Sequence, residues 1–351
     1  MKYFPERLKA ARKMNGYSLQ DLSDAIRNQF NKQALQRLET GEAKPDSQTI
    51  SLLSKALHLP SDYFVRESVV QLEQLRFRKL KKLPAKEVEK ITAQTVDYLE
   101  RYLELEDMLG IDNKIAFVPK TYVLKNEGDI EKAVLDLRKK WKLGEDALTN
   151  IIDILEENGV KVYLMDTDSS FSGMSTVLSG KIAVIVLNEN REIPIVRRRF
   201  SALHELAHLY LDLSAFDEKR AEKICDRFAS SMLIIPAKLI QILGNRRTSI
   251  VMRELYFIAG KYGISLSAIA YQAMSLGIVS VSYHRFFMIR YSQFKTKDKE
   301  HIVYSGKENS DRFLQLLFRA VAEEIISTSK AASLNNQRLG DFRELLDNAA
   351  K

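Results

Sequence analysis

One stretch of the sequence, RFSALHELAHLYL at residues 199–211, constrains the fold most strongly, because it reads as a helix with two histidines on one side. His204 and His208 stand four positions apart. Residues at this spacing differ by about 40° in azimuth and about 6 Å in height on an α-helix, so both imidazoles can reach one ion. The apolar residues of the stretch predict a partly buried helix, and burying histidines costs free energy unless a partner satisfies them. We therefore predict a metal site, with a chance pair of histidines as the alternative.

Glu205 follows the first histidine directly and lies about 100° round the helix from it. From that position a carboxylate can lean over the open side of the ion without binding it. It can then take a proton from the attacking water and pass it to the leaving amine. Glu205 is the predicted catalytic base.

A second helix is predicted by the text EKRAEKICDRFASSMLIIP. Glu222 and Asp226 stand four apart on one face of it, and Glu222 is the predicted third ligand, with Glu218 one turn earlier as the rival. We expect Asp226 to accept the second ring N–H of a ligand histidine and so to orient that ring. Two histidines and one carboxylate favour zinc, with manganese or iron as alternatives.

The combined text IAVIVLNENREIPIVRRRFSALHELAHLYLD and AEKICDRFASSMLIIP resembles the ImmA/IrrE family of metallopeptidases. The resemblance implies that His204, His208 and Glu222 bind the metal and that Glu205 is the base. Asp226 stands where many relatives have asparagine, which makes it the better hydrogen-bond acceptor. The resemblance implies an activity as well: family members typically cleave a helix-turn-helix repressor, which relieves repression after stress or in mobile elements, and a toxin–antitoxin role is a further expectation.

The start of the chain, with RLKAARKMNGYSLQDLSDAI and NKQALQRLETGEAKPDSQTISLLSKALHLP, resembles a Cro/repressor-type (XRE) helix-turn-helix domain. Its third helix is expected to enter the DNA major groove by its first turn. Glutamine can bond adenine, and lysine can reach guanine or phosphate. The alternative is an adaptor of the same shape that binds protein. The predicted DNA contacts are Lys32, Gln33, Gln36 and Arg37, with a pair between Arg37 and Glu39 as the alternative for that arginine.

These patterns predict a mainly α protein with a small β-sheet, divided into four parts. Two further predictions concern single stretches. The strand KIAVIVLNEN is expected to lie beside the active-site helix, where it either receives an extended substrate or forms part of the core. The basic cluster before Pro84 reads as a solvated helix face, with DNA-backbone contact as the alternative. The four parts are a helix-turn-helix domain at 1–66, a helical connector at 67–118, a zincin-like metallopeptidase domain at 119–280 and a C-terminal α+β region at 281–351, in which YHRFFMIRYSQF reads as a strand.

The composition indicates the cellular compartment in which the protein is expected to act. The single cysteine, Cys225, excludes an internal disulfide and is expected to be a small core residue in a reducing compartment. No apolar run approaches the length of a membrane span, and the N-terminus lacks the apolar centre of a signal peptide, so we expect a cytoplasmic protein. The net charge of +8 is compatible with nucleic-acid binding.

Taken together, the sequence predicts a metal-dependent endopeptidase fused to a DNA-binding domain, with a double-stranded operator and a repressor or antitoxin-type substrate as partners. The alternative is a DNA-binding regulator or antitoxin whose peptidase-like domain binds a partner or senses metal without cleaving. Autoproteolysis near Pro84 and assembly into a homodimer are further options. Candidates for stabilising the oxyanion are Tyr256, Tyr262, Tyr271 and His284.

Overall fold

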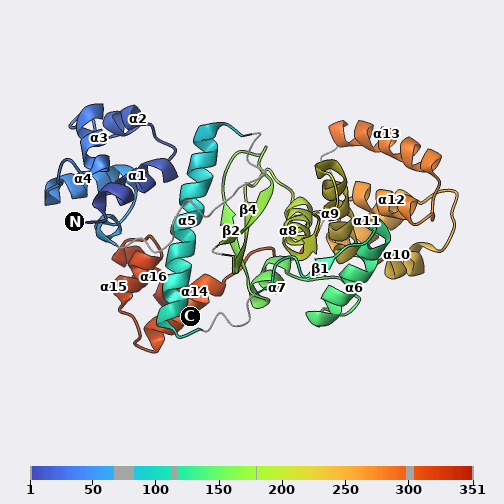
Figure 1. The fold of residues 1–351 in the computed structure, drawn as a ribbon. Coiled ribbons are helices and arrows are strands. Elements are labelled where there is room, and N and C mark those ends of the chain that lie inside the picture. The colour runs from blue at the N-terminus through green and yellow to red at the C-terminus, as the bar shows by residue number, and fades with distance from the viewer. Residues whose placement is uncertain (1, 67–82, 112–116, 179, 298–303, 350–351) are drawn as a thin grey trace. The chain divides into compact units, whose positions relative to one another are not determined.

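The computed structural model describes residues 2–66, 83–111, 117–178, 180–297 and 304–349. They are mainly helical with a small sheet (Figure 1), which is the predicted fold class. The chain divides into two compact units, Met1–Lys114 with Asp311–Lys351, and Ile115–Ser310. No helix among the described residues is both long enough and apolar enough to cross a bilayer.

The first 66 residues form the predicted short helices, and local side-chain caps set where several of them begin. Ser18 makes a capping box with Asp21, and Asn31 and Asp46 each accept a hydrogen bond from a backbone N–H three residues on. Phe4, Leu22, Leu35 and Leu53 share one buried core with Tyr63 and Phe64. The helices are α1 Phe4–Met14, α2 Leu19–Ala25, α3 Lys32–Thr40, α4 Ser47–Leu57 and a 3-10 helix Ser61–Val65.

The turn between α2 and α3 contains two residues in an unusual backbone conformation. Arg27 and Asn28 lie in the left-handed region, with φ of 55° and 57°. Ser23 Oγ donates a hydrogen bond of 2.7 Å to the carbonyl of Phe30, which closes the turn. The turn is therefore folded back onto α2.

The contacts within the first unit group the chain differently from the predicted four-part division. The connector helix α5, Ala85–Met108, packs along α1 and belongs to the same unit as the N-terminal helices. A buried ion pair of 2.6 Å between Arg7 and Glu100 joins them. The segment at 67–82, which contains the predicted basic cluster, lies outside the described residues. Three C-terminal helices complete this unit: α14 Arg312–Ala322, α15 Thr328–Leu334 and α16 Leu339–Ala349.

The second unit is built on a three-stranded sheet of order β2-β4-β3. β2 Val160–Met165 pairs in parallel with β4 Ile182–Asn188, and β3 Gly173–Leu178 pairs antiparallel with β4. β4 is thus the central strand and both its edges are paired, so of the two predictions for KIAVIVLNEN the core strand is right and the substrate-receiving strand is wrong. β3 forms the edge of the sheet on that side.

Helices cover this sheet and form the main core of the unit (Figure 1). α8 packs against β3 and β4 and against α9, so it lies between the sheet and α9. Two short strands, β1 Tyr122–Val123 and β5 Leu211–Asp212, pair in parallel beyond the end of α8. The helices are α6 Ile130–Lys140, α7 Ile151–Glu157, α8 Ile195–Tyr210, α9 Glu218–Leu233, α10 Pro236–Leu243, α11 Met252–Tyr262, α12 Leu266–Ser275 and α13 Val281–Lys297.

The strand predicted at YHRFFMIRYSQF is wrong, because these residues lie in α13. Tyr283, Phe287 and Tyr291 recur every four residues, and such residues share a face in a strand as well as in a helix. In the structure their rings stack at 6.5 and 5.7 Å along one side of the helix. The described residues of 281–351 are helical or irregular, so the C-terminal region is not α+β in the part that the structure describes.

A buried arginine fastens α8 to its surroundings. Arg199 is fully buried and pairs with the buried carboxylate of Glu308. Its guanidinium also donates to the carbonyls of Leu148 and Thr149, each at 2.7 Å, and to that of Gly263 at 3.2 Å. The helix that carries the histidines is therefore tied to three other segments of its unit.

Candidate metal centre

Two neighbouring helices bring the predicted ligands together. α8 starts directly after Pro194, and α9 is opened by Asp217, whose side chain accepts from the N–H of Arg220 at 2.9 Å. His204 contacts Asp226, while His208, one turn later, contacts Glu222, one turn earlier. These crossed pairs mean that α8 and α9 run antiparallel with their polar positions facing each other.

Three side chains converge between the helices. The Nε2 atoms of His204 and His208 are 3.2 Å apart. The Glu222 carboxylate places Oε2 at 3.3 Å from the first Nε2 and Oε1 at 3.2 Å from the second. The donors of a tetrahedral zinc site, about 2.0–2.1 Å from the ion, are themselves separated by about 3.3 Å. The spacing and the chemistry of these three side chains therefore fit one divalent ion.

Asp226 controls which nitrogen of His204 faces that point. Its Oδ1 lies 2.8 Å from Nδ1 of the ring. Because a carboxylate can only accept, the proton of this hydrogen bond belongs to Nδ1, and the lone pair of Nε2 is left for the shared centre. The geometry is that of a carboxylate orienting a ligand histidine.

Glu205 is buried on the sheet side of α8. Its Oε2 accepts a hydrogen bond of 2.7 Å from Ser175 Oγ of the edge strand β3. Gly173, at the start of β3, packs closely against β4: a Cβ there would lie 3.0 Å from a methyl of Leu187 and 3.1 Å from the carbonyl oxygen of Val186. Ser175 was missed by the sequence reasoning, and only its place in a strand-like stretch before the helix could have suggested it.

Two alternative ligands occupy different positions. Glu218 is exposed in the first turn of α9, whereas Glu222 reaches both histidines. Cys225 is fully buried, as expected of a core residue, but its Sγ lies within 4.8 Å of one ring nitrogen of each histidine. Both a carboxylate and a thiolate bind zinc, and the Glu222 oxygens lie at 3.3 and 3.2 Å from the two Nε2 atoms, the separation expected of donors that share one ion.

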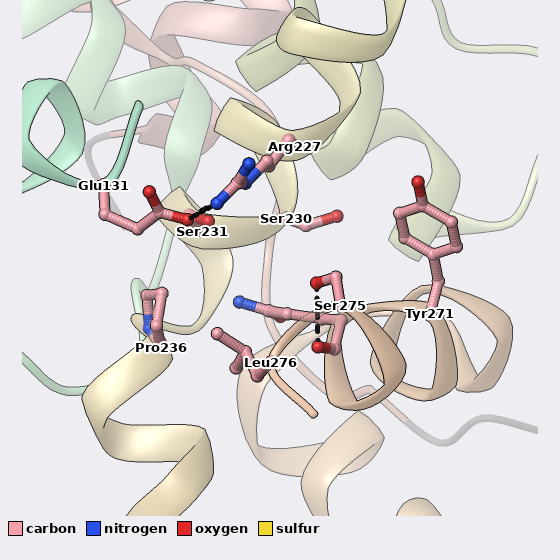
Figure 2. Close-up of a pocket in the computed structure, with 9 residues that line it drawn as sticks. Glu131, Arg227, Ser230, Ser231, Pro236, Tyr271, Ser275 and Leu276 are labelled. Atoms are coloured by element: carbon pink, nitrogen blue, oxygen red, sulfur yellow. Dashed lines mark hydrogen bonds and ion pairs between the residues drawn. The ribbon is translucent and has the colours of Figure 1, made fainter. Parts of the chain in front are cut away.

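The candidates for an oxyanion stabiliser lie in other surroundings. Tyr262 is fully buried and its hydroxyl donates to Asp146 at 3.4 Å. Tyr256 is exposed, and Tyr271 contacts the ring of His284 at 5.9 Å. Figure 2 shows Tyr271 at a small pocket between α9 and α12, whose other lining residues do not include the histidines.

The predicted DNA-contacting residues form an exposed face of α3. Lys32, Gln33, Gln36 and Arg37 are all exposed, while the leucines of the same helix are buried. The predicted pair between Arg37 and Glu39 is wrong. Both carboxylate oxygens of Glu39 are instead held by Arg12, at 2.6 and 2.8 Å. Arg37 is left loosely paired with Glu42 at 3.9 Å, so its guanidinium is available to a phosphate.

Comparison with known protein families gives one match in the N-terminal helices and one in the unit that carries the histidines. Residues 8–64 match the family model described as helix-turn-helix, and residues 155–274 match the one described as IrrE N-terminal-like domain. No curated protein matches the chain. The chain therefore joins an XRE-type helix-turn-helix domain to a metallopeptidase-like domain of the ImmA/IrrE kind.

Proposed function

We propose that the protein is a metal-dependent endopeptidase acting in transcriptional regulation, which cleaves a repressor or antitoxin-type protein while its helix-turn-helix domain binds an operator. The observation that carries the proposal is the convergence of His204, His208 and Glu222 within 3.3 Å of one another. The buried carboxylate of Glu205 follows the first histidine on the same helix. A domain kept only for binding has no need of a base at that position.

The residues divide the work of peptide hydrolysis among them. His204, His208 and Glu222 would hold a divalent ion, with zinc favoured by the donor set, and Asp226 keeps the first ring in the tautomer that leaves Nε2 free. When bound, such an ion supplies Lewis-acid activation of water and of the scissile carbonyl.

Glu205 carries the proton in this scheme. Its carboxylate accepts the proton that the attacking water loses and delivers it to the nitrogen of the departing amine, as the carbon–nitrogen bond breaks. The hydrogen bond from Ser175 holds the carboxylate in place. Burial between the sheet and α8 keeps other water away from it.

The edge strand β3 provides a place for the substrate. β3 pairs with β4 along one side, and no second strand of the described residues pairs with its other side. An extended peptide can add to such an edge through main-chain hydrogen bonds. Ser175 lies on this strand and contacts the base, so a peptide along β3 would run close to Glu205.

The Glu205→Gln variant tests the proposal against a regulator that does not cleave. Cells that express the wild-type chain, Glu205→Gln or the surface control Glu192→Gln are compared by sequencing newly formed protein N-termini. We expect new N-termini in a helix-turn-helix protein with the wild type and the control, and their loss with Glu205→Gln.

A protein captured on Glu205→Gln is then incubated with the wild-type chain and zinc. The expected products are two fragments whose masses sum to the substrate plus one water. If wild type and Glu205→Gln relieve repression equally and produce the same N-termini, catalysis is not the function and the non-cleaving regulator takes its place.

A further inference from the structure

A second pocket is formed within the first unit, by residues of α4 and of the α15–α16 turn, whereas the candidate metal centre belongs to the second unit. It has a volume of about 600 Å³ and is open to solvent. One wall is the C-terminal half of α4, and the other is the turn between α15 and α16 with the start of α16. The residues at 336–341 that form this second wall lie outside both segments matched by family models.

The α4 wall is a polar stripe. Ser51, Ser54, Lys55 and His58 all line the pocket. Their spacing of i, i+3, i+4 and i+7 puts them on one face of the helix. Ser54 Oγ donates to the carbonyl of Leu59 at 2.5 Å, so its proton is used and the hydroxyl can offer a ligand only an acceptor. The face is therefore rich in hydroxyl groups and carries a cation at its middle.

The opposite wall adds a second cation and one anion. Arg338 and Asp341 both line the pocket and are exposed. Among the described residues, no carboxylate comes within ion-pair distance of Lys55 or Arg338. Two cations without a counter-ion attract an anion, and lysine and arginine on facing walls can both bind the oxygens of one phosphate group.

The two walls are held together within the unit. Asn336 Nδ2 donates to Asp97 of α5 at 2.8 Å, and Arg101 of α5 donates to the carbonyl of Leu334 at 2.8 Å. Ser333 Oγ also donates to Asp62, which lies in the 3-10 helix that follows α4. These bonds fix the α15–α16 turn beside the helix-turn-helix domain, so the pocket is preformed.

We propose that this pocket binds a small phosphorylated polyol, such as a sugar phosphate or a nucleotide. Lys55 and Arg338 bind the phosphate group. Asp341 and the serines of α4 bind hydroxyl groups of the ligand, since Asp341 offers only acceptors. The volume falls in the usual range for small-molecule sites, roughly 300–1,000 Å³. A ligand here touches the DNA-binding domain directly through α4.

Titration calorimetry on the full-length protein tests the proposal, with ribose 5-phosphate, adenosine monophosphate, ribose and inorganic phosphate as probes. We expect at least one of the two phosphorylated compounds to bind, and ribose and phosphate alone to bind about tenfold more weakly or worse, because each makes only part of the contacts. The stronger of the two phosphorylated compounds distinguishes a sugar-phosphate site from a nucleotide site.

Two variants locate the binding. Arg338→Gln removes the guanidinium and is expected to weaken binding at least about tenfold, which is the loss of one charge-assisted contact. Arg343→Gln, five residues further along α16 and outside the pocket, is the matched control and should leave binding unchanged. Hydrogen exchange should slow on ligand binding at 51–61 and 336–341, and circular dichroism checks that both variants are folded.

Three results would overturn the proposal. The first is no binding of either phosphorylated compound at millimolar concentration. The second is binding that Arg338→Gln leaves intact, or that Arg343→Gln weakens equally. The third is equal affinity for phosphate alone, which would indicate a general anion site.

Discussion

Replacing Arg199 by methionine tests the buried ion pair that anchors α8, the helix that carries His204 and His208. The variant keeps the apolar length of the side chain but removes the guanidinium that pairs with Glu308. It also leaves the carbonyls of Leu148, Thr149 and Gly263 without the donor they now share. Removing one partner of a buried ion pair costs about 3–5 kcal/mol. For a unit of this size that corresponds to a fall in Tm of about 6–20 °C.

The loss of stability caused by Arg199→Met should depend on pH. Burial raises the pKa of Glu308 to about 7, although the charge of Arg199 acts to lower it. In the unfolded chain the pKa of a glutamate is about 4.3. Between these two pKa values folding takes up a proton on Glu308. The stabilisation that comes from this protonation is lost as the pH rises through 7. Without Arg199 the folded pKa moves higher still, so the loss continues above pH 7. We expect the difference between Arg199→Met and wild type to be larger at pH 8 than at pH 6 by at least about 1 kcal/mol.

The sole tryptophan, Trp141, lies in the same unit as Arg199 and makes the assay specific for it. Urea unfolding is followed by Trp141 fluorescence at both pH values. Arg197→Met, on an exposed position of the same helix, is the control and is expected to cost less than about 0.5 kcal/mol. If Arg199→Met costs no more than this control, or its cost does not grow with pH, the reasoning about the buried pair is refuted.

Three further experiments probe other parts of the structure. Asp226→Ala should weaken metal binding about 10–100-fold in competition with a chromophoric chelator, because His204 loses its orienting partner; unchanged affinity would argue against that role. In urea unfolding, Gly263→Ala should destabilise the second unit more than Gly277→Ala does. Both glycines have positive φ, but only a Cβ at 263 meets the Arg199 side chain. Equal losses of stability would count against close packing at Gly263. In DNA-binding titrations, Lys32→Ala should weaken binding to all sequences and reduce the salt slope by about 1, while Gln33→Ala should relax sequence preference; the opposite assignment would exclude the predicted docking of α3.

Features set by residues close together in the chain could be predicted from the sequence. Ser18 and Asn31 cap their helices, and a cap needs only a side chain and an N–H three residues on. The same holds for the histidine pair on α8 and the acidic pair on α9, since helical spacing alone puts each pair on one face. Bringing the two pairs together required only that neighbouring helices pack against each other.

Contacts between distant residues could not be predicted in this way. Ser175 reaches Glu205 across thirty positions, and Arg199 meets Glu308 across more than a hundred, so no local pattern marks either pair. The same limit explains why α5 reads as a free connector. Its charged positions suit an exposed helix, yet Glu100 is buried against Arg7 of α1. A buried charge needs a partner of opposite charge. Its burial can therefore be predicted only when that partner is known, and here the partner is distant in the sequence.

The metal content of the purified chain tests the central claim most directly. The wild type, Glu205→Gln, His208→Ala, Glu222→Gln and the control Glu218→Gln are each loaded with zinc, separated from free metal by gel filtration and analysed for bound metal. We predict one ion per chain in the wild type, Glu205→Gln and Glu218→Gln, and loss of most of it in His208→Ala and Glu222→Gln. A wild type that retains no ion, or a His208→Ala variant that retains as much as the wild type, would contradict the assignment of these side chains as ligands.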